Sequence, residues 1–330
     1  MADKVIVVEG LVKHFGPVFA LNGIDFDVPA ATVLGVLGPN GAGKTTTVRI
    51  LTTILEPDDG RASVLGLDVV RDAETVRTKI GLAGQYAAVD ENLTGLENLR
   101  LIGQLSHQHK KAVAARAVEL LERFSLTGAA GRPVRTYSGG MRRRLDVAAA
   151  LVHRPPVLFL DEPTTGLDPS GRSDLWALTE QLVADGTTVL LTTQYLEEAD
   201  RLADNIIVID DGRIIARGTP AELKSGLGST IIEVRMPDAA GALRASAGFR
   251  SVGPSEVADD GRTVEIHVAE GGRCVLEVAR ILDSQQLVPD AVAIREPTLD
   301  DVFLQLTGHR AETSPGGEVP ADRGREEGAA

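Results

Sequence analysis

The stretch from Gly38 to Thr45 constrains this chain more than any other. It reads Gly-Pro-Asn-Gly-Ala-Gly-Lys-Thr and fits the pattern G-x-x-x-x-G-K-[ST] in full. Residues 32–37 before it predict a strand, and residues 45–55 after it predict a helix that ends before Pro57. Glycines here let backbone N–H groups wrap phosphate oxygens at the positive end of a helix. The pattern in this context predicts a nucleotide-binding loop.

Three side chains of this loop have predicted roles with MgATP. We expect Lys44 to reach the β- and γ-phosphates, the Thr45 hydroxyl to ligate Mg²⁺, and Thr46 to contact the α-phosphate. The remaining residues expected to hold the phosphates are Gly38, Asn40, Gly41, Ala42 and Gly43.

A second chemical feature follows the apolar run of residues 157–160, which ends in Asp161 and Glu162. An apolar strand delivers such residues to the carboxyl edge of a parallel sheet, where ligands of open α/β sheets bind. Asp161 is then expected to hold Mg²⁺ directly or through water. Glu162 is expected to accept a proton from the attacking water. An acidic pair after a strand can also be only a helix cap, but behind a phosphate-binding loop the catalytic interpretation is favoured.

Composition limits the cellular compartment and the kinds of partner that this chain is expected to have. The 330 residues carry a formal net charge of −13, which argues against a general nucleic-acid binder. The single cysteine, Cys274, rules out an intramolecular disulfide and fits a reducing compartment, where it is expected to be a small buried hydrophobe. No run approaches the ~20 apolar residues of a spanning helix. If the protein serves a membrane, another chain is expected to supply the spanning part.

Strands alternate with helices over residues 1–225, which predicts an α/β domain with a mainly parallel sheet. The buried parallel strands are expected at residues 157–160 and 188–192. The other elements predicted there are strands 5–9 and 24–28, helices 112–124 and 173–184, and a hairpin of residues 205–210 and 213–216.

A boundary is expected near residues 224–229, where Gly226 and Gly228 interrupt the pattern. Residues 226–309 then predict a small α+β domain of the order βαββαβ, which is the ferredoxin-like pattern. Its predicted elements are strands 230–236, 249–252, 263–268 and 291–295, helices 239–247 and 274–282, and a last helix from Thr298 with Thr298 and Asp301 as a capping pair. The Gly/Pro/Glu-rich residues 310–330 predict a disordered tail.

The segment from Tyr137 to Met141 narrows the family of nucleotide-binding protein. It reads Tyr-Ser-Gly-Gly-Met and precedes a predicted helix, about 20 residues before the Asp161 strand. It resembles the LSGGQ signature of ATP-binding cassette (ABC) proteins, with Tyr for Leu and Met for Gln. The resemblance implies that Ser138, Gly139 and Gly140 close on the ATP held by a second copy of the chain, so that two chains enclose two ATP molecules.

Further positions match elements of the same family in order. The resemblance implies that Phe15 stacks on adenine, although an ordinary apolar loop residue is the alternative. Gln85 matches the glutamine that senses the γ-phosphate side, takes part in Mg²⁺ binding and faces the membrane subunit; an exposed loop residue is the alternative. Asp168, in Gly-Leu-Asp-Pro, matches a loop that lines the subunit interface, and a helix-capping turn is the alternative.

One position departs from the general ABC pattern. A histidine is expected after the strand that ends near Thr193, and this chain has Gln194. A glutamine amide donates a hydrogen bond to a phosphate, but it carries neither a proton to transfer nor a positive charge. Turnover is then slower, or Glu162 dominates the chemistry, or the position no longer matters.

Several stretches resemble one group more narrowly. They are residues 84–90, 136–145, 191–200 and 299–304, and together they resemble the daunorubicin/doxorubicin-resistance ATP-binding subunits of actinobacteria. Gln194 is typical of that group. The resemblance implies an exporter at the cytoplasmic face of the membrane, built from a homodimer of this chain and a separate multi-spanning permease that moves a hydrophobic drug, antibiotic or lipid. It also implies that the C-terminal domain steadies the dimer or couples it to the permease, with helix 299–305 as a candidate contact.

Two other functions remain open from the residues alone. One is a soluble ABC ATPase that acts on ribosomes or DNA, and the other is a regulatory nucleotide-binding subunit with vestigial hydrolysis. The single cassette and negative charge argue against the first, and an intact Glu162 argues against the second. The basic run Arg142–Arg144 is expected to be the solvated face of a helix.

Overall fold

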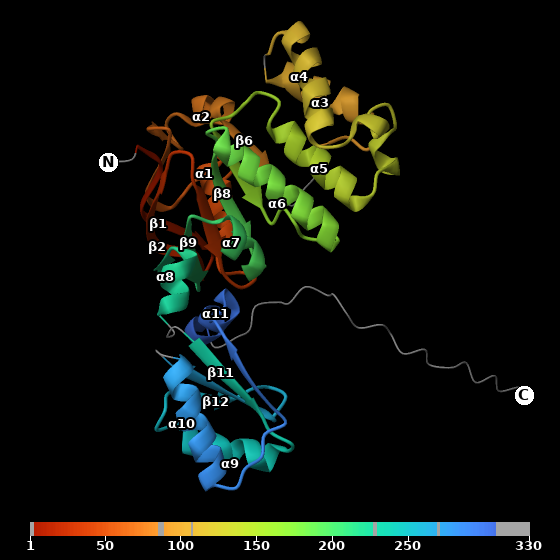
Figure 1. The fold of residues 1–330 in the computed structure, drawn as a ribbon. Coiled ribbons are helices and arrows are strands. Elements are labelled where there is room, and N and C mark those ends of the chain that lie inside the picture. The colour runs from red at the N-terminus through yellow and green to blue at the C-terminus, as the bar shows by residue number, and fades with distance from the viewer. Residues whose placement is uncertain (1–2, 85–88, 107, 227–229, 269–270, 308–330) are drawn as a thin grey trace, which may run out of the picture.

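The computed structural model describes residues 3–84, 89–106, 108–226, 230–268 and 271–307. These residues form a larger N-terminal unit and a smaller C-terminal unit that lies at one end of it (Figure 1). Within the described residues, no helix combines the length and the hydropathy needed to cross a membrane. The expected tail, residues 310–330, lies outside the described residues.

The centre of the N-terminal unit is a six-stranded sheet in the order β10-β9-β3-β8-β7-β6. All its neighbouring pairs are parallel except β9 with β10, which is the expected hairpin. Every residue of β3, β7 and β8 is buried, as near-continuous apolar runs predict for parallel strands. The strands are β3 (Val33–Leu37), β6 (Ile80–Ala83), β7 (Val157–Asp161), β8 (Thr188–Thr193), β9 (Asn205–Asp210) and β10 (Arg213–Gly218).

A second, antiparallel sheet has the order β2-β1-β4-β5. Its strands are β1 (Lys4–Phe15), β2 (Val18–Pro29), β4 (Asp59–Val64) and β5 (Leu67–Asp68). The first two are much longer than predicted, because the β1–β2 register shifts between Val8 and Leu11 and interrupts the alternation that marks a strand. The left-handed Gly10 (φ 56°) lies at that irregularity.

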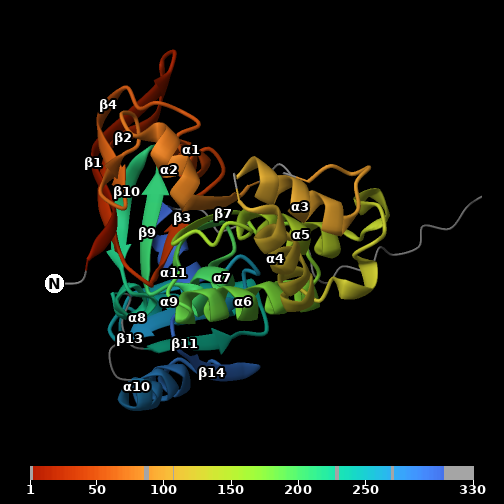
Figure 2. The same cartoon turned by 90° about the horizontal axis from the view of Figure 1, so that it is seen from above.

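Helices cover both faces of the central sheet (Figure 2). One face packs with the antiparallel sheet and α1 (Lys44–Leu51) around a core that includes Val36, Val48 and Phe159. The other packs against helices that include α6 (Pro169–Ala184) and α7 (Leu196–Leu202). The short helices α2 (Ala73–Lys79) and α8 (Pro220–Ser225) complete this unit.

Helix α1 ends four residues earlier than the sequence predicts. Thr52 turns its hydroxyl back to the Val48 carbonyl (2.8 Å), and Thr53 takes a left-handed conformation with φ 63°. A β-branched residue in that conformation does not continue a helix. The chain therefore leaves α1 before Pro57 exerts any effect.

Three helices stand to one side of the central sheet as a helical subdomain (Figures 1 and 2). They are α3 (Gly95–Leu105), α4 (Lys110–Arg123) and α5 (Gly139–Ala150), and two short 3₁₀ helices lie between α4 and α5. Tyr137, the residue that replaces leucine in the signature, belongs to this subdomain's core. Its hydroxyl donates to the Ala129 carbonyl (2.7 Å). The tyrosine fits there only because residue 95 is a glycine, since a Cβ at Gly95 would lie 2.4 Å from the phenol oxygen.

The C-terminal unit has the sheet order β12-β13-β11-β14 with every pair antiparallel, which confirms the predicted ferredoxin-like pattern. Its elements are β11 (Thr230–Arg235), α9 (Ala239–Phe249), β12 (Ser255–Val257), β13 (Thr263–Val268), α10 (Gly271–Ser284) and β14 (Ala291–Arg295). The strand predicted at residues 249–252 is wrong. Phe249 ends α9 and is buried in the core between the helices and the sheet. The apolar pattern that suggested a strand here therefore reflects burial of a helix.

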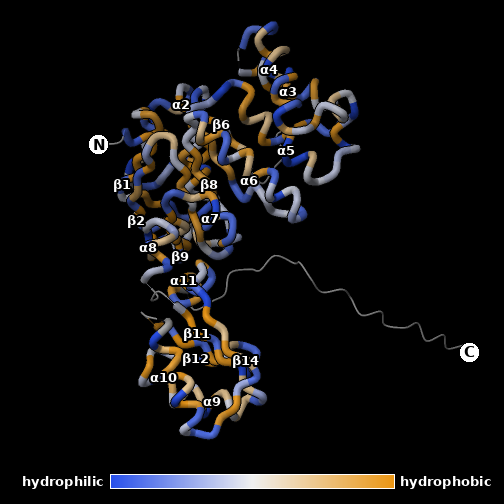
Figure 3. The backbone as a smooth tube through the Cα atoms, viewed as in Figure 1, coloured by the Kyte–Doolittle hydropathy of each residue, from blue (hydrophilic) through white to orange (hydrophobic). Residues whose placement is uncertain are grey.

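The last helix, α11 (Leu299–Thr307), returns to the N-terminal unit. The predicted capping pair is confirmed: Thr298 N–H donates to Asp301 Oδ2 (2.7 Å), and Asp301 N–H donates to the Thr298 hydroxyl (3.4 Å). Apolar side chains of α11, among them Val302 and Phe303, share a buried cluster with Leu196 of α7. Figure 3 shows apolar colour in the strands on both sides of this junction.

Candidate nucleotide-binding site

The loop from Gly38 to Lys44 joins β3 to α1 at the carboxyl edge of the central sheet. Two of its glycines are required by close approach. A Cβ at Gly38 would lie 2.2 Å from the Ile209 carbonyl oxygen, and one at Gly43 (φ 112°) would lie 2.4 Å from the Ala20 carbonyl oxygen. The Ala42 N–H donates to the Pro39 carbonyl (3.2 Å) and closes the turn that contains Asn40 and Gly41. The two glycines therefore bring the backbone of the loop close to neighbouring strands at the start of α1.

Lys44 is the first residue of α1 and is 4% exposed. Its Nζ donates to the carbonyls of Gly38 (2.7 Å) and Pro39 (3.1 Å) and lies 3.8 Å from Glu162 Oε1. A buried ammonium held by carbonyl oxygens beside a helix N-terminus favours an anion at that place. The predicted partner of the phosphates is therefore in position.

The carboxylate of Asp161 lies beside two hydroxyl groups from different elements. Its Oδ1 is 3.3 Å from Thr45 Oγ1 and 2.5 Å from Thr192 Oγ1. Carboxylate and hydroxyl oxygens are hard donors, the type that Mg²⁺ prefers. Thr45 and Asp161 therefore fit the predicted Mg²⁺ site.

Glu162 has a backbone conformation that is unusual for a residue other than glycine. Its φ is 51°, and its N–H donates to the Thr192 carbonyl (3.0 Å). Such left-handed non-glycine residues need surrounding structure to hold them and concentrate at functional sites. The mostly buried carboxylate thus lies beside the Lys44 ammonium at the end of β7.

Arg143 is a functional candidate that sequence reasoning missed. The run Arg142–Arg144 was expected to be a solvated face, but the Arg143 side chain is 13% exposed. Its guanidinium donates to the carbonyls of Asp161 (3.1 Å), Glu162 (3.0 Å), Pro163 (2.7 Å) and Gly84 (2.5 Å). Arginine offers five donors in a rigid fork, so one residue of α5 fixes the backbone of the candidate catalytic segment.

The environment of Arg143 also sets its pKa. Burial lowers the pKa of this guanidinium, and the nearby Asp146 carboxylate, 3.5 Å away, opposes that effect. Arginine keeps its charge in proteins, so these contacts are charge-assisted. In the sequence, Arg143 is one of three consecutive arginines, and no neighbouring residue distinguishes it from the other two. Arg142, for example, pairs with Glu91 (2.7 Å) instead.

The signature residues begin α5. Ser138 caps this helix, because its Oγ accepts from the Met141 N–H (3.3 Å). Ser138 and Gly139 are exposed, and a Cβ at Gly139 would meet no atom within 4 Å. Gly140 is nearly as open, with only Leu167 at 3.8 Å. The helix N-terminus is therefore accessible to an anion brought from outside this chain.

A pocket of about 510 Å³ connects the signature helix to the candidate catalytic segment. Its lining residues are Gly139, Arg142, Arg143, Asp146, Glu162, Thr165, Gly166 and Leu167. Asp168 follows directly and caps α6 by accepting from the Gly171 N–H (3.0 Å). The capping alternative for Asp168 is thus present in the structure, and its role at a subunit interface stays a prediction.

The structure locates three further predicted residues, and a fourth falls beyond its described part. Phe15 ends β1 with a ring that is 53% exposed, so an aromatic surface is available for a base. Gln194 directly follows β8 and is partly buried. Thr46 lies in the first turn of α1. Gln85 lies outside the described residues.

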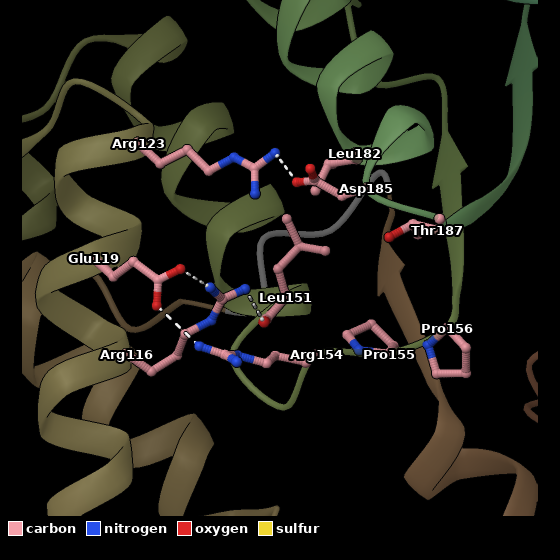
Figure 4. A pocket seen from close by; sticks show the side chains of 11 residues that line it. Arg116, Glu119, Arg123, Leu151, Arg154, Pro155, Pro156, Leu182, Asp185 and Thr187 are labelled. Carbon is pink, nitrogen blue, oxygen red and sulfur yellow. Dashed lines mark hydrogen bonds and ion pairs between the residues drawn. The ribbon is translucent and has the colours of Figure 1, made fainter. Parts of the chain in front are cut away.

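A second hollow, of about 470 Å³, lies at the opposite ends of the strands (Figure 4). Pro156 precedes β7 and Thr187 precedes β8, so this hollow is at the amino ends of the parallel strands. Its arginines already have carboxylate partners, as in Arg123 with Asp185 (2.8 Å) and Arg154 with Glu119 (3.2 Å). These pairs join the helical subdomain to the sheet, and ligands of such sheets bind at the other edge.

Comparison with known proteins agrees with this geometry. The family model for ABC transporters matches residues 21–165, and the model for the C-terminal domain of DrrA1-3-like ATP-binding proteins matches residues 218–307. A solved structure of an ATP-binding subunit of an ABC transporter superposes with a TM-score of 0.62 at 27% sequence identity, over 67% of this chain and 92% of that chain.

Two curated relatives match almost the whole chain. The daunorubicin resistance ATP-binding protein DrrA3 of Streptomyces coeruleorubidus is 53% identical over 93% of this chain and 97% of its own length. The Nod factor export ATP-binding protein I of Ralstonia nicotianae is 38% identical over 93% of this chain and 95% of its own length. The chain therefore belongs to the ABC ATP-binding proteins, in the family of the daunorubicin resistance ATP-binding proteins.

Proposed function

We propose that this chain binds and hydrolyses MgATP to power export of a hydrophobic drug, antibiotic or lipid through a separate membrane permease. The observation that carries the proposal is the meeting of Lys44, Thr45, Asp161 and Glu162 at one edge of the central sheet. Lys44 comes from α1 and Glu162 from the end of β7, so residues more than 100 positions apart form one site.

Each side chain has a distinct task in the proposed reaction. Lys44 and the backbone N–H groups of residues 38–43 hold the phosphates and their growing negative charge. Mg²⁺, held by Thr45 and Asp161, supplies further neutralisation of phosphate charge. Glu162 accepts the proton of the attacking water, and its fixed backbone sets the direction of that carboxylate.

Gln194 and the signature complete the proposed site. The Gln194 amide donates a hydrogen bond on the γ-phosphate side but carries no charge there. The accessible N-terminus of α5 at Ser138 and Gly139 supports a role in binding the ATP of a second copy. We propose that two chains form a homodimer around two ATP molecules, at the cytoplasmic face of the membrane, with Asp168 near their interface and Gln85 near the permease.

The transport role rests on the relatives. One is a daunorubicin resistance ATP-binding protein and another is a Nod factor export ATP-binding protein, and both match more than 90% of this chain. The first name supports a drug as cargo, and the second supports the outward direction. We propose residues 226–309 as an accessory domain that steadies the dimer or the coupling to the permease. The apolar face of α11 is buried within this chain, so only its exposed side remains available to a permease.

Affinity capture tests the whole proposal. Tagged Glu162→Gln protein, expected to bind ATP and stall as a dimer, is isolated from host membranes in MgATP, and co-purifying chains are identified by mass spectrometry. Recovery of a multi-spanning permease is the expected result. Glu197→Gln, on the exposed side of α7, is the matched control and should release phosphate at the wild-type rate.

Other outcomes identify the alternatives. Ribosomal or DNA-associated partners would replace the exporter with a soluble ATPase. A wild-type chain that binds ATP without releasing phosphate, alone or with its permease, would make it a regulatory subunit. A Glu162→Gln protein with full activity would remove Glu162 from its role as base.

A further inference from the structure

Glu198 is a buried carboxylate that the proposed chemistry does not use. It lies in α7, four residues after Gln194, and its exposure is 0%. Burying a carboxylate is unfavourable unless hydrogen bonds compensate it. The partners of this side chain therefore indicate what keeps it there.

Two donors from different segments converge on the Glu198 carboxylate. The Thr164 hydroxyl donates to Oε2 (3.1 Å), and the Trp176 indole N–H donates to Oε1 (3.1 Å). The Thr193 hydroxyl lies near enough to this carboxylate to lower its pKa. Thr164 lies two residues after Glu162, Trp176 lies in the middle of α6, and Thr193 lies next to Gln194.

The last two threonines of β8, Thr192 and Thr193, make contacts on opposite sides of the strand. Successive side chains of a strand point to opposite faces. Thr192 bonds to the Asp161 carboxylate and accepts from the Glu162 N–H (3.1 Å). Thr193 accepts from the Tyr195 N–H (3.0 Å), which orders the backbone around Gln194.

We propose that Glu198 is a positioning residue that ties the Gln194 segment to the loop after Glu162. Because α7 begins two residues after Gln194 and its Glu198 accepts from Thr164, this bond keeps the amide and the carboxylate that face the γ-phosphate at a constant separation. Trp176 anchors Glu198 to α6, outside this connection. The inference rests on the proposed function, because it assigns Gln194 and Glu162 to the γ-phosphate.

The positive charge of Arg143 supports the same connection from the other side. It acts on Glu198 electrostatically while its guanidinium holds the carbonyls of Asp161 and Glu162. The loop after β7 is therefore fixed twice, by Arg143 through its backbone and by Glu198 through Thr164. If residue 198 contributed only to the stability of the fold, an apolar side chain of similar volume would serve there equally well.

The test compares Thr164→Val with Trp176→Phe in the full-length wild-type background. Each substitution removes one donor to Glu198 while keeping much of the side-chain shape. Thr164→Val should lower the kcat of ATP hydrolysis about tenfold and change KM less than about twofold, because it misplaces catalytic groups without touching the nucleotide. Thr164→Ser, which restores the hydroxyl, should recover most of the kcat.

The control separates positioning from folding. Trp176→Phe should lower Tm at least as much as Thr164→Val, yet keep kcat within about twofold of wild type. If Thr164→Val fails to fold, Glu198→Gln, which retains the shape, should show the same fall in kcat at nearly constant KM.

Two results would overturn the inference. One is a Thr164→Val enzyme whose kcat matches that of Trp176→Phe, and the other is a KM effect with unchanged kcat. A wild-type chain without ATPase activity would instead refute the proposed function itself.

Discussion

The N-terminal and C-terminal units bury different kinds of side chain. Every fully buried polar or charged residue in the described part of the chain lies between residues 44 and 198. The core of the C-terminal unit, by contrast, consists of apolar side chains such as Ile232, Phe249 and Ile266. Since each buried polar group needs a partner, an apolar core is the simpler way to stabilise a small unit.

The two sheets show the same contrast in their patterns. Strands β3, β7 and β8 are buried on both faces, and β7 and β8 end at their carboxyl edges in the polar residues Asp161, Thr192 and Thr193. Strand β13 alternates between buried and partly exposed residues, because helices α9 and α10 cover only one face of its sheet. The comparison teaches that buried polar groups concentrate in the unit that carries the candidate site, whereas the core of the second unit is apolar. The four predictions below run from the largest expected effect on ATP turnover to the smallest.

Lys44→Ala should have the largest effect. Removing the buried ammonium deprives the phosphates of their closest positive charge, so phosphate release should fall by about a hundredfold or more. Nucleotide affinity, measured by titration with a fluorescent ATP analogue, should fall as well. Lys111→Ala, on the exposed start of α4, is the control. Wild-type phosphate release from Lys44→Ala would remove the phosphate-binding role from this loop.

Arg143→Gln tests whether a buried polar group of the first unit serves the reaction. The shorter, neutral side chain leaves carbonyls of residues 161–163 without donors and loosens the backbone at Glu162, so kcat should fall about tenfold. Arg142→Gln breaks only an exposed pair with Glu91 and should change kcat less than about twofold. Equal rates in a steady-state ATPase assay would make Arg143 a stabilising residue only.

Glu198→Gln should change how stability depends on pH. Burial raises the pKa of Glu198 to about 7, against the lowering effects of its hydrogen bonds and of Arg143. The folded state therefore holds this proton up to about pH 7, whereas the unfolded state releases it near 4.5. The stabilising contribution is fully present below that lower pH and is lost as pH rises through 7.

The wild-type free energy of unfolding should accordingly decline between pH 5 and pH 8 by about 3 kcal/mol relative to Glu198→Gln. Urea unfolding followed by circular dichroism measures both proteins at each pH. Parallel pH curves for the two proteins would mean that Glu198 keeps one charge state throughout this range.

Ile266→Ala should have the smallest effect on turnover. It opens a cavity in the C-terminal core and should destabilise that unit by about 2–5 kcal/mol, with phosphate release of the isolated chain changed less than about twofold. Phe303→Ala, at the junction with α7, is the companion variant that loosens the contact between the units. Loss of ATPase activity from Ile266→Ala would show that the two units are not separate in the way the comparison implies.

Local patterns predicted the parts of the site that neighbouring residues build. The loop at Gly38–Thr45, the strand that ends in Asp161 and the cap formed by Thr298 and Asp301 are each marked by a short motif or an apolar run of neighbouring residues. The prediction of a strand at 249–252 was wrong because a short apolar run is the same in a buried helix end, such as that of Phe249, as in a buried strand. The length of β1 was missed because a bulge interrupts its alternation.

The sequence by itself therefore determined the α/β class, the ferredoxin-like order, the phosphate-binding loop and the acidic pair, since each follows from periodicity or from a short motif. Only the tertiary structure decided that Arg143 reaches the backbone after β7, that Glu198 receives donors from Thr164 and Trp176, and that α11 packs on α7. These contacts join residues 18 to about 100 positions apart, and their partners look ordinary in their own surroundings. A residue's local pattern indicates whether it is buried, but the packing of distant elements decides what it meets there.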